Sequence, residues 1–240
     1  EIALASLPRI EQLFVDAPGV GEQDLSAKLF VARRKAEMAI DDDEGFYLCS
    51  LSGSVIAYKG LVMPVDLPRF YLDLDDERLE TAICVFHQRF STNTMPLWHL
   101  AQPFRLLAHN GEINTLKGNL NWMKSHEIRM ASGTFGDMAE DIKPIVAAGS
   151  SDSAALDSVF EVLVRAGRSA PMAKTMLVPE SWSKQAVEMP KAWQDMYSYC
   201  NSVMEPWDGT EALAMTDGSW VCAGLDRNGL PPMRYVVTGD

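Results

Sequence analysis

The stretch LLAHNGEINTLKGN, residues 106 to 119, places an Asn-Gly pair directly behind an apolar run. Gly111 lacks a side chain and adopts positive φ readily, so its N–H can approach a ligand closely. Asn110 adds a side-chain NH₂ donor. Two such donors at the end of a strand could stabilise a developing oxyanion. An isolated Asn-Gly pair is more often a type I′ hairpin turn, so both interpretations stand at this point.

Two charged residues elsewhere in the chain could hold the rest of a substrate. Arg89 closes an apolar run, and a fixed guanidinium there could grip a carboxylate through two hydrogen bonds. Asp152 begins an expected helix, where a carboxylate can cap the helix or receive an ammonium group. Taken separately, each is more simply a structural residue. Combined with an oxyanion site, they describe an amino acid whose side-chain carbonyl is attacked.

Hydrophobic patterning predicts the elements that would position these residues. Helical periodicity is expected over residues 22–40, 113–130, 151–167 and near 184–204, with Ser151 or Asp152 as an N-cap. Strands are expected over residues 46–51, 54–60, 81–90, 104–110, 211–216, 219–225 and 233–238. Strand pairs joined by tight turns, with helices between the sets, indicate antiparallel sheet with helices on its faces, an α+β fold.

Composition and charge exclude several classes of protein. The 240 residues are 47% hydrophobic, enough for a sizeable core in one domain, and the net charge of −12 disfavours nucleic acid and anionic membranes as partners. No segment approaches the roughly 20 apolar residues of a membrane span, and the first residues lack a signal-peptide pattern. The histidines lack i, i+4 spacing, so no metal site is expected. Four dispersed cysteines indicate reduced thiols of a cytoplasmic protein: Cys49, Cys84, Cys200 and Cys222.

Three longer stretches carry a resemblance to a known family. They are HQRFSTNTMPLWHLAQPFRLLAHNGEINTLKGNLNWMKSHE, GSSDSAALD and CNSVMEPWDGTEALAMTDGSWVCAGLDRNGLPPMRY. They closely resemble the glutamine amidotransferase domain of glutamate synthase large subunits, a class II amidotransferase with the N-terminal-nucleophile hydrolase fold. The resemblance implies a four-layer αββα sandwich. Residues 1–240 would be the central and C-terminal part of that single domain, so the sandwich would be incomplete in this chain.

The resemblance also implies roles for individual residues. Arg89, in HQRFST, matches the ligand of the glutamine α-carboxylate, and Thr92 helps in the same pocket. Asn110 and Gly111 match the oxyanion-hole pair. Asp152, in SSDS, matches the ligand of the α-amino group. Two further residues are expected to shape the pocket without a catalytic step: His87 and His109.

One departure concerns the nucleophile. In the family it is a cysteine at the mature N-terminus, whose free α-amino group serves as its base. This chain begins with Glu1, and Cys49 falls in an expected strand with no match to that motif. We therefore expect the nucleophile to lie in an N-terminal portion that this chain lacks, and the chain alone to be inactive.

The parent protein implied by the resemblance hydrolyses L-glutamine to glutamate and ammonia, and passes the ammonia to 2-oxoglutarate. No cofactor is expected in this segment, whereas FMN and an iron–sulfur cluster are implied for downstream domains. The implied partners are those synthase domains and an electron-donating small subunit, with the electron donor left open. One alternative is a module that lacks the nucleophile and only binds glutamine or glutamate. Another is a different class II enzyme, such as an amidophosphoribosyl- or asparagine-forming amidotransferase.

Overall fold

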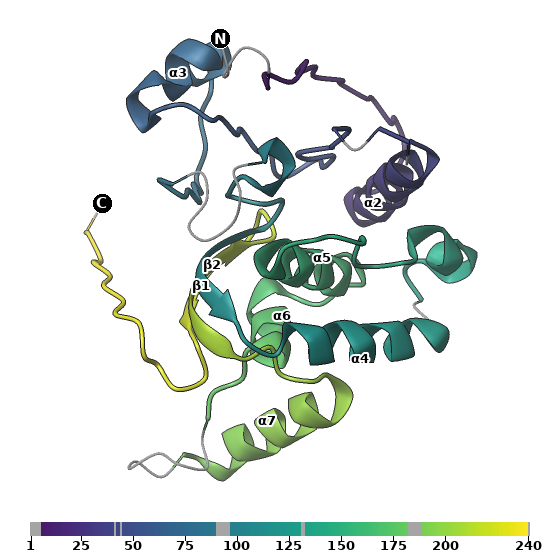
Figure 1. The fold of residues 1–240 in the computed structure, drawn as a ribbon, viewed down its shortest axis with the longest axis vertical. Coiled ribbons are helices and arrows are strands. Elements are labelled where there is room, and N and C mark those ends of the chain that lie inside the picture. Colours follow the sequence, from purple (N-terminus) through teal and green to yellow (C-terminus); the bar gives the residue numbers. More distant parts are fainter. Residues whose placement is uncertain are drawn as a thin grey trace.

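Helices pack on one face of a small antiparallel sheet in the computed structural model of the chain (Figure 1), which describes residues 6–40, 42–43, 45–89, 97–130, 133–181 and 189–239. The helices are α2 (Glu22–Ala39), α3 (Leu67–Phe70), α4 (Leu116–Ile128), α5 (Asp152–Arg165), α6 (Ala170–Leu177) and α7 (Lys191–Val203). The strands are β1 (Leu107–Ile113), β2 (Gly209–Thr216) and β3 (Val221–Leu225). Short 3-10 segments lie at Pro64–Asp66, Leu72–Asp75, Trp98–Leu100 and Gly136–Ile142. None of the described helices is both long and apolar enough to cross a membrane.

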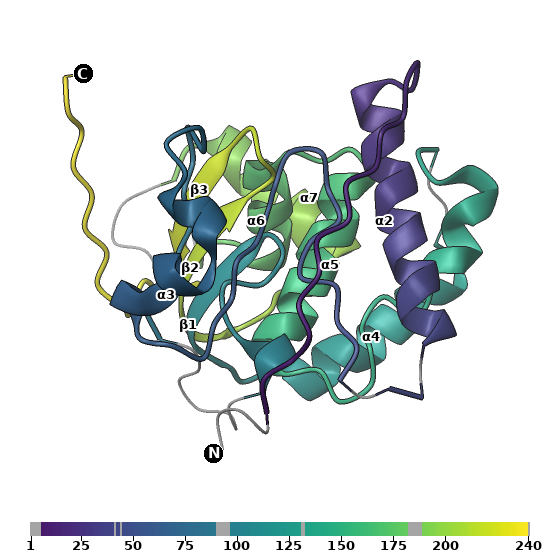
Figure 2. The same cartoon turned by 90° about the horizontal axis from the view of Figure 1, so that it is seen from above.

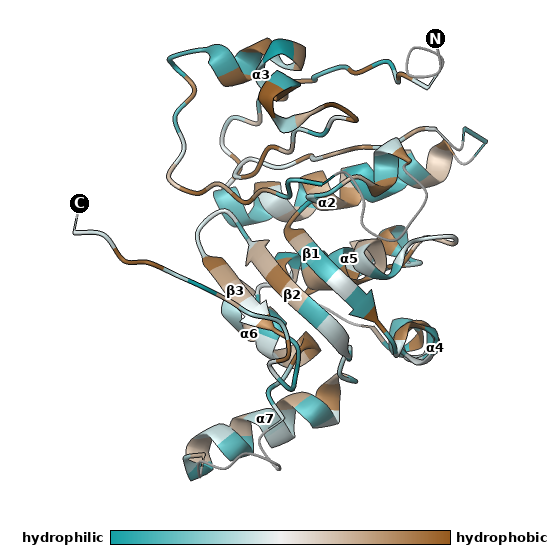
Figure 3. Ribbon diagram, turned by 60° about the vertical axis from the view of Figure 1, so that its left-hand side comes forward, coloured by the Kyte–Doolittle hydropathy of each residue, from teal (hydrophilic) through white to brown (hydrophobic). Residues whose placement is uncertain are grey.

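The sheet has the order β1-β2-β3, and both pairs are antiparallel. Alternate residues of β1 and β2 point to a buried face, among them Leu107 and Met215, which are 0% exposed. Helices α5 and α6 pack on the sheet, and Figures 2 and 3 show both on the same side of it. The opposite face carries exposed residues, including Asn110 and Thr210. These features confirm the α+β prediction and leave one face of the sheet accessible.

Helix α5 forms the centre of the core, as its sequence predicted. Leu156, Val159 and Phe160 recur at helical spacing and are 0% exposed. Each buried apolar side chain of this size contributes about 1.5–3 kcal/mol to folding. Ser151 Oγ accepts a hydrogen bond from Ala154 N at 3.2 Å, so Ser151 is the N-cap and Asp152 is the first helical residue.

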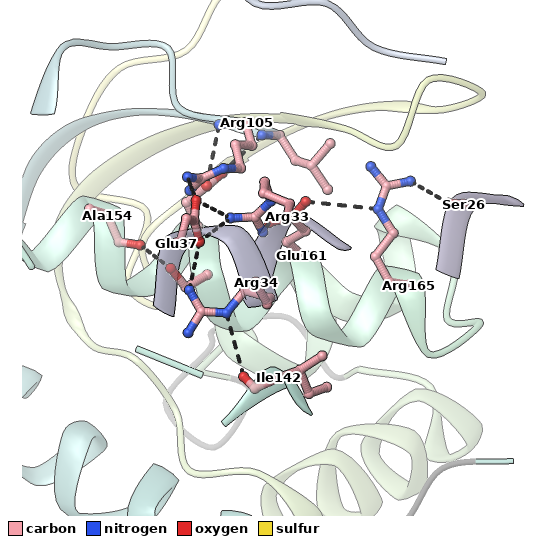
Figure 4. A network of polar contacts seen from close by, with 12 residues as sticks. Ser26, Arg33, Arg34, Glu37, Arg105, Ile142, Ala154, Glu161 and Arg165 are labelled. Atoms are coloured by element: carbon pink, nitrogen blue, oxygen red, sulfur yellow. Dashed lines mark hydrogen bonds and ion pairs between the residues drawn. The ribbon is translucent and has the colours of Figure 1, made fainter. Parts of the chain in front are cut away.

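A buried network of charges holds α2 against α5 (Figure 4). The Glu37 carboxylate forms ion pairs with three guanidinium groups, with N–O distances of 2.8 Å to Arg33, 2.7 Å to Arg34 and 2.6 Å to Arg105. Arg33 also contacts Glu161 of α5 at 2.5 Å. Burial alone would raise the pKa of Glu37, but the surrounding guanidinium groups outweigh it and hold that pKa below its usual value. Arg105 precedes β1, so the same carboxylate ties the first helix to the start of the sheet.

Four expected strands are absent from the described residues. The hairpin expected over 46–51 and 54–60 is wrong, because serine side chains accept hydrogen bonds from its backbone. Ser52 Oγ accepts from Ser54 N at 3.1 Å and from Val55 N at 3.3 Å. Residues 81–89 and 233–238 form no strand either. The C-terminal segment instead leaves the sheet (Figure 1), and Tyr235 is 89% exposed.

Several other boundaries differ from the expectations. Strand β1 begins at Leu107 rather than at residue 104 and continues to Ile113, where a helix was expected to start. Helix α6 has no counterpart among the predicted helices. Its Pro171 lies in the first helical turn, where proline is tolerated. Helix α7 covers only Lys191–Val203 of the helix expected near 184–204, and residues 182–188 lie outside the described part.

Two glycines provide a matched test of the helix and the sheet. Gly118 lies inside α4 with open space around its Cα, so Gly118→Ala is expected to stabilise the protein by about 0.5–1 kcal/mol. At Gly209 an added Cβ would collide with the Glu112 carbonyl oxygen, so Gly209→Ala is expected to destabilise it by about 2 kcal/mol or more. Urea denaturation measures both changes. Equal effects of the two substitutions would contradict the β1–β2 register.

Glu37→Gln tests the buried network. The substitution leaves three guanidinium groups without their shared anion, so a loss of about 3–5 kcal/mol in unfolding free energy is expected at pH 7. Because the folded-state pKa of Glu37 is lowered, its contribution is present at neutral pH and is lost as the pH falls below the unfolded value of about 4.5. The control is Glu140→Gln, in an exposed pair with Lys143. Urea denaturation of both variants from pH 3 to 7 measures the unfolding free energy. Equal losses in Glu37→Gln and Glu140→Gln would refute the role of the network.

Candidate active site

The free edge of β1 carries the strongest candidate for a binding site. The Gln102 side-chain amide donates to the His109 carbonyl and accepts from the His109 N–H, both at 2.6 Å. Farther along, Ile113 N donates to Asp152 Oδ2 at 3.0 Å. Backbone groups of an antiparallel strand alternate between its two edges, so the N–H of Gly111 belongs to this same edge. Gln102 and Asp152 thus occupy the backbone groups on both sides of Gly111.

The Asn-Gly pair lies inside a strand and is not a turn. Asn110 pairs with Ala212 and Gly111 with Glu211 in an uninterrupted register. Gly111 has φ +135°, and a Cβ there would collide with the Thr210 carbonyl oxygen, so only glycine fits. The Asn110 side chain is exposed and has no hydrogen-bond partner among the described residues. The Asn110 side chain therefore lies on the accessible face of the sheet, next to the edge to which the Gly111 N–H belongs.

Asp152 is held in place by its own helix and by β1. Its Oδ1 accepts from Ser153 N at 2.7 Å and from Ser153 Oγ at 3.3 Å, and its Oδ2 accepts from Ile113 N. A carboxylate has about four acceptor positions, so one position is left for a ligand donor. Since Ser151 caps the helix, Asp152 is not needed as the N-cap.

The structure places the remaining predicted site residues less closely. Arg89 is exposed, and within the described part of the chain its guanidinium makes no hydrogen bond or ion pair. The Arg89 carbonyl oxygen lies 2.6 Å from His87 Nδ1. Thr92 lies outside the described residues. The structure therefore places Asn110 and Gly111 on β1 and holds Asp152 against the end of the same strand at Ile113, while the site roles of these residues, of Arg89 and of Thr92 stay predictions.

Three residues at this site were missed by the sequence analysis. No sequence pattern indicates the hydrogen bonds of Gln102 and Ser153. Gln102 bonds to the His109 backbone, and Ser153 Oγ lies 2.5 Å from His109 Nδ1. Glu211 did have a signal, because it alternates with two buried residues, Leu213 and Met215, of the same strand. It is 0% exposed, and burial raises its pKa to about 8, with nearby carboxylates adding to the effect.

Comparison with known proteins shows the family to which the chain belongs. The model of the family described as "Glutamine amidotransferases class-II" matches residues 1–240. This chain belongs to the class II glutamine amidotransferases. The glutamate synthase [NADPH] large chain of Azospirillum brasilense is 54% identical over 243 residues, which cover 100% of this chain. The ferredoxin-dependent glutamate synthase 2 of Synechocystis sp. is 47% identical over 236 residues, or 97% of the chain, and the glutamate synthase [NADH] of Saccharomyces cerevisiae is 43% identical over 247 residues, or 100% of it.

This amidotransferase chain spans only a small part of those relatives, namely 16%, 15% and 11% of their lengths in the same order. Their names give three different electron donors, yet all three align along almost the whole chain. Similarity to all three relatives therefore does not indicate one electron donor.

Gly111→Ala tests the close approach of β1 and β2 at the candidate site. It combines an unfavourable φ with a backbone collision, so a loss of about 2 kcal/mol or more in unfolding free energy is expected. The control is Gly149→Ala, where φ is +76° but an added Cβ meets nothing within 4 Å, and about 1 kcal/mol is expected. Denaturation curves that show equal losses would refute the collision at Gly111.

Proposed function

We propose that this chain is the glutamine-binding part of the amidotransferase domain of a glutamate synthase, which hydrolyses L-glutamine to glutamate and ammonia. The observation that carries the proposal is the arrangement on β1. Two hydrogen-bond donors, the Asn110 amide and the Gly111 N–H, lie on the same strand as Ile113, whose N–H donates to Asp152. Asp152 has one acceptor position left. This arrangement occurs in a chain that matches the class II family along its entire length.

Glutamine fits these groups in one orientation. Its side-chain carbonyl oxygen faces Asn110 and Gly111, which stabilise the oxyanion formed when the amide carbon is attacked. Its α-ammonium group meets the remaining acceptor position of Asp152. Its α-carboxylate binds Arg89, with Thr92 beside it, since a guanidinium offers two parallel donors to a carboxylate. His109 supports the site from the buried side of β1, and His87 is assigned to the same pocket by the family resemblance.

The attack itself requires a thiolate. Burial raises the pKa of both Cys200 and Cys222, which disfavours the thiolate form of either. The proposal therefore gives the attacking role to the N-terminal cysteine that the resemblance to class II enzymes implies, and it gives substrate binding and oxyanion stabilisation to the residues of this chain.

The remainder of the parent activity belongs to other parts of the protein. Ammonia released at this site would pass to 2-oxoglutarate at downstream domains that carry FMN and an iron–sulfur cluster, with an electron-donating small subunit as a further partner. Among the described residues no group of three or more His, Cys, Asp or Glu side chains could hold a metal ion. The accessible face of the sheet supports a further layer there, as in the αββα sandwich, with residues 1–240 as one part of a single domain.

Two substitutions in the full-length protein test this proposal. Asn110→Ala removes one oxyanion donor and is expected to lower kcat for glutamine hydrolysis by about 10²–10³. Asp152→Asn removes the charge that meets the ammonium group and is expected to raise KM about 10- to 100-fold. Ammonia release at varied glutamine concentration measures both constants.

The control for both variants is Asp141→Asn, whose side chain pairs with Lys35 at 3.2 Å away from β1. It is expected to leave kcat and KM unchanged. Unchanged KM in Asp152→Asn would remove the assigned role of that residue. Glutamine binding without ammonia release by the unaltered full-length protein would favour a binding module without a nucleophile.

A further inference from the structure

A line of polar side chains runs through the interior behind the Asn110–Gly111 segment. It starts at Asp152, whose Oδ1 lies 3.3 Å from Ser153 Oγ. It continues from Ser153 Oγ to His109 Nδ1 at 2.5 Å, and then from His109 Nε2 to Glu211 Oε2 at 3.7 Å. The three inner members, Ser153, His109 and Glu211, are at most 7% exposed. The line therefore joins the first turn of α5 to β2 by passing through β1.

One placement of protons satisfies both hydrogen bonds of Ser153 Oγ. In it Ser153 Oγ donates to Asp152 Oδ1 and accepts from His109 Nδ1–H. A neutral imidazole with its proton on Nδ1 has a lone pair on Nε2. His109 Nε2 and both carboxyl oxygens of Glu211 have no hydrogen-bond partner among the described residues, and they face each other. Their separation of 3.7 Å is longer than a hydrogen bond, and a proton on Glu211 would give the His109 lone pair a donor and draw the two side chains together.

We propose that Glu211 is a positioning residue for glutamine hydrolysis: as a neutral acid it donates to His109 Nε2 and orders His109, Ser153 and Asp152 behind the oxyanion donors. This inference rests on the proposed function, because Asp152 is the group that meets the substrate ammonium. It adds to that function a residue that touches no substrate. Glu211 lies directly opposite Gly111 in the β1–β2 register, so its charge state acts at the oxyanion donors as well.

The surrounding charges favour the neutral pair near pH 7. Burial, followed by Asp208 and Asp226, raises the pKa of Glu211 to about 8, with Asp152 acting in the same direction and Lys174 of α6 opposing it. For His109, burial lowers the pKa, His87 adds to that effect, and Asp152 opposes it. Both shifts disfavour the charged forms, so a protonated Glu211 faces a neutral imidazole.

Loss of the Glu211 proton would change both ends of the line. A carboxylate at Glu211 attracts a donor, so His109 would carry its proton on Nε2 and Nδ1 would become an acceptor. Ser153 Oγ–H would then turn toward His109 and away from Asp152. A negative charge opposite Gly111 would also oppose the oxyanion that forms there. Both effects lower turnover as the pH rises through the region near 8.

Glu211→Gln in the full-length protein separates charge from hydrogen bonding. The Gln amide keeps a donor for His109 Nε2 but does not titrate. Relative to this variant, the unaltered protein is expected to lose about tenfold in kcat between pH 7 and pH 9, the order expected of one buried charge near the reacting group. The ratio of the two kcat values cancels titrations common to both proteins. Glu211→Leu removes the donor as well and is expected to lower kcat at both pH values.

The matched control is a second histidine–glutamate pair, His126–Glu205, which is half-exposed with 2.6 Å between Nε2 and Oε2. Glu205→Gln is expected to leave the pH profile of kcat unchanged. A constant ratio between the unaltered protein and Glu211→Gln from pH 7 to 9 would overturn the proposal, as would an equal change in Glu205→Gln.

A second measurement does not depend on catalysis. Hydrogen exchange of the peptide that spans β1, corrected for the intrinsic effect of pH, is expected to accelerate between pH 7 and 9 in the unaltered protein. It is expected to stay constant in Glu211→Gln. If the full-length protein released no ammonia, the proposed function would fail while this exchange still tested the pair. Identical exchange in the two proteins would overturn the pairing even if hydrolysis were present.

Discussion

The attachment of α5 to β1 is the constraint on which the candidate site depends. At one end the Asp157 carboxylate accepts from Leu106 N at 2.9 Å and from Arg105 N at 3.3 Å. At the other end Asp152 accepts from Ile113 N at 3.0 Å. One helix therefore holds both ends of the strand that carries Asn110 and Gly111. Because the buried face of α5 is fixed by core packing, the position of that strand is fixed with it.

Burial of charge is what makes this attachment specific. Burial raises the pKa of Asp157 to about 6, with Glu161 adding to the effect, while Arg105 and two backbone N–H groups oppose it. Arg105 in turn shares Glu37 with α2. An unpaired charge in such a place is costly, so the elements must meet in the arrangement that pairs each charge. The network thus favours one arrangement of α2, α5 and β1 over others with similar apolar burial.

The edge of β1 shows how a sheet can present a donor without inviting another strand. An uncovered edge exposes a row of backbone groups that can pair with other chains. Here Gln102 satisfies both groups of His109, and Asp152 satisfies the N–H of Ile113. Side chains on both sides thus leave the Gly111 N–H as a localised donor. Such a donor suits a small oxyanion better than it suits a strand.

Features that depend on neighbouring residues were determined by the sequence itself. Helices α2 and α5 followed from apolar residues at helical spacing, the N-cap from Ser151, and the β2–β3 hairpin from Asp217-Gly218, whose Asp217 Oδ1 accepts from Trp220 N at 2.7 Å. The positive φ of Gly111 was expected, but its position inside a strand, against the Thr210 carbonyl oxygen, was not. The family resemblance identified Asn110, Gly111 and Asp152 as candidates, and in the structure the first two lie on β1 while Asp152 contacts the same strand at Ile113.

Only the tertiary structure decided which extended segments pair and which polar side chains meet. Residues 46–60 have the composition of a hairpin, yet local serine hydrogen bonds replace the ladder. Strand β1 continues through the Asn-Gly pair because β2 pairs with it in an uninterrupted register. Strand β2 lies about a hundred residues later in the sequence, so this pairing is not visible locally. The burial of Glu211 can be read from its alternation with Leu213 and Met215, but its place opposite His109 cannot. Strand pairing and buried polar contacts of this kind join residues that are distant in sequence, so no local pattern contains them.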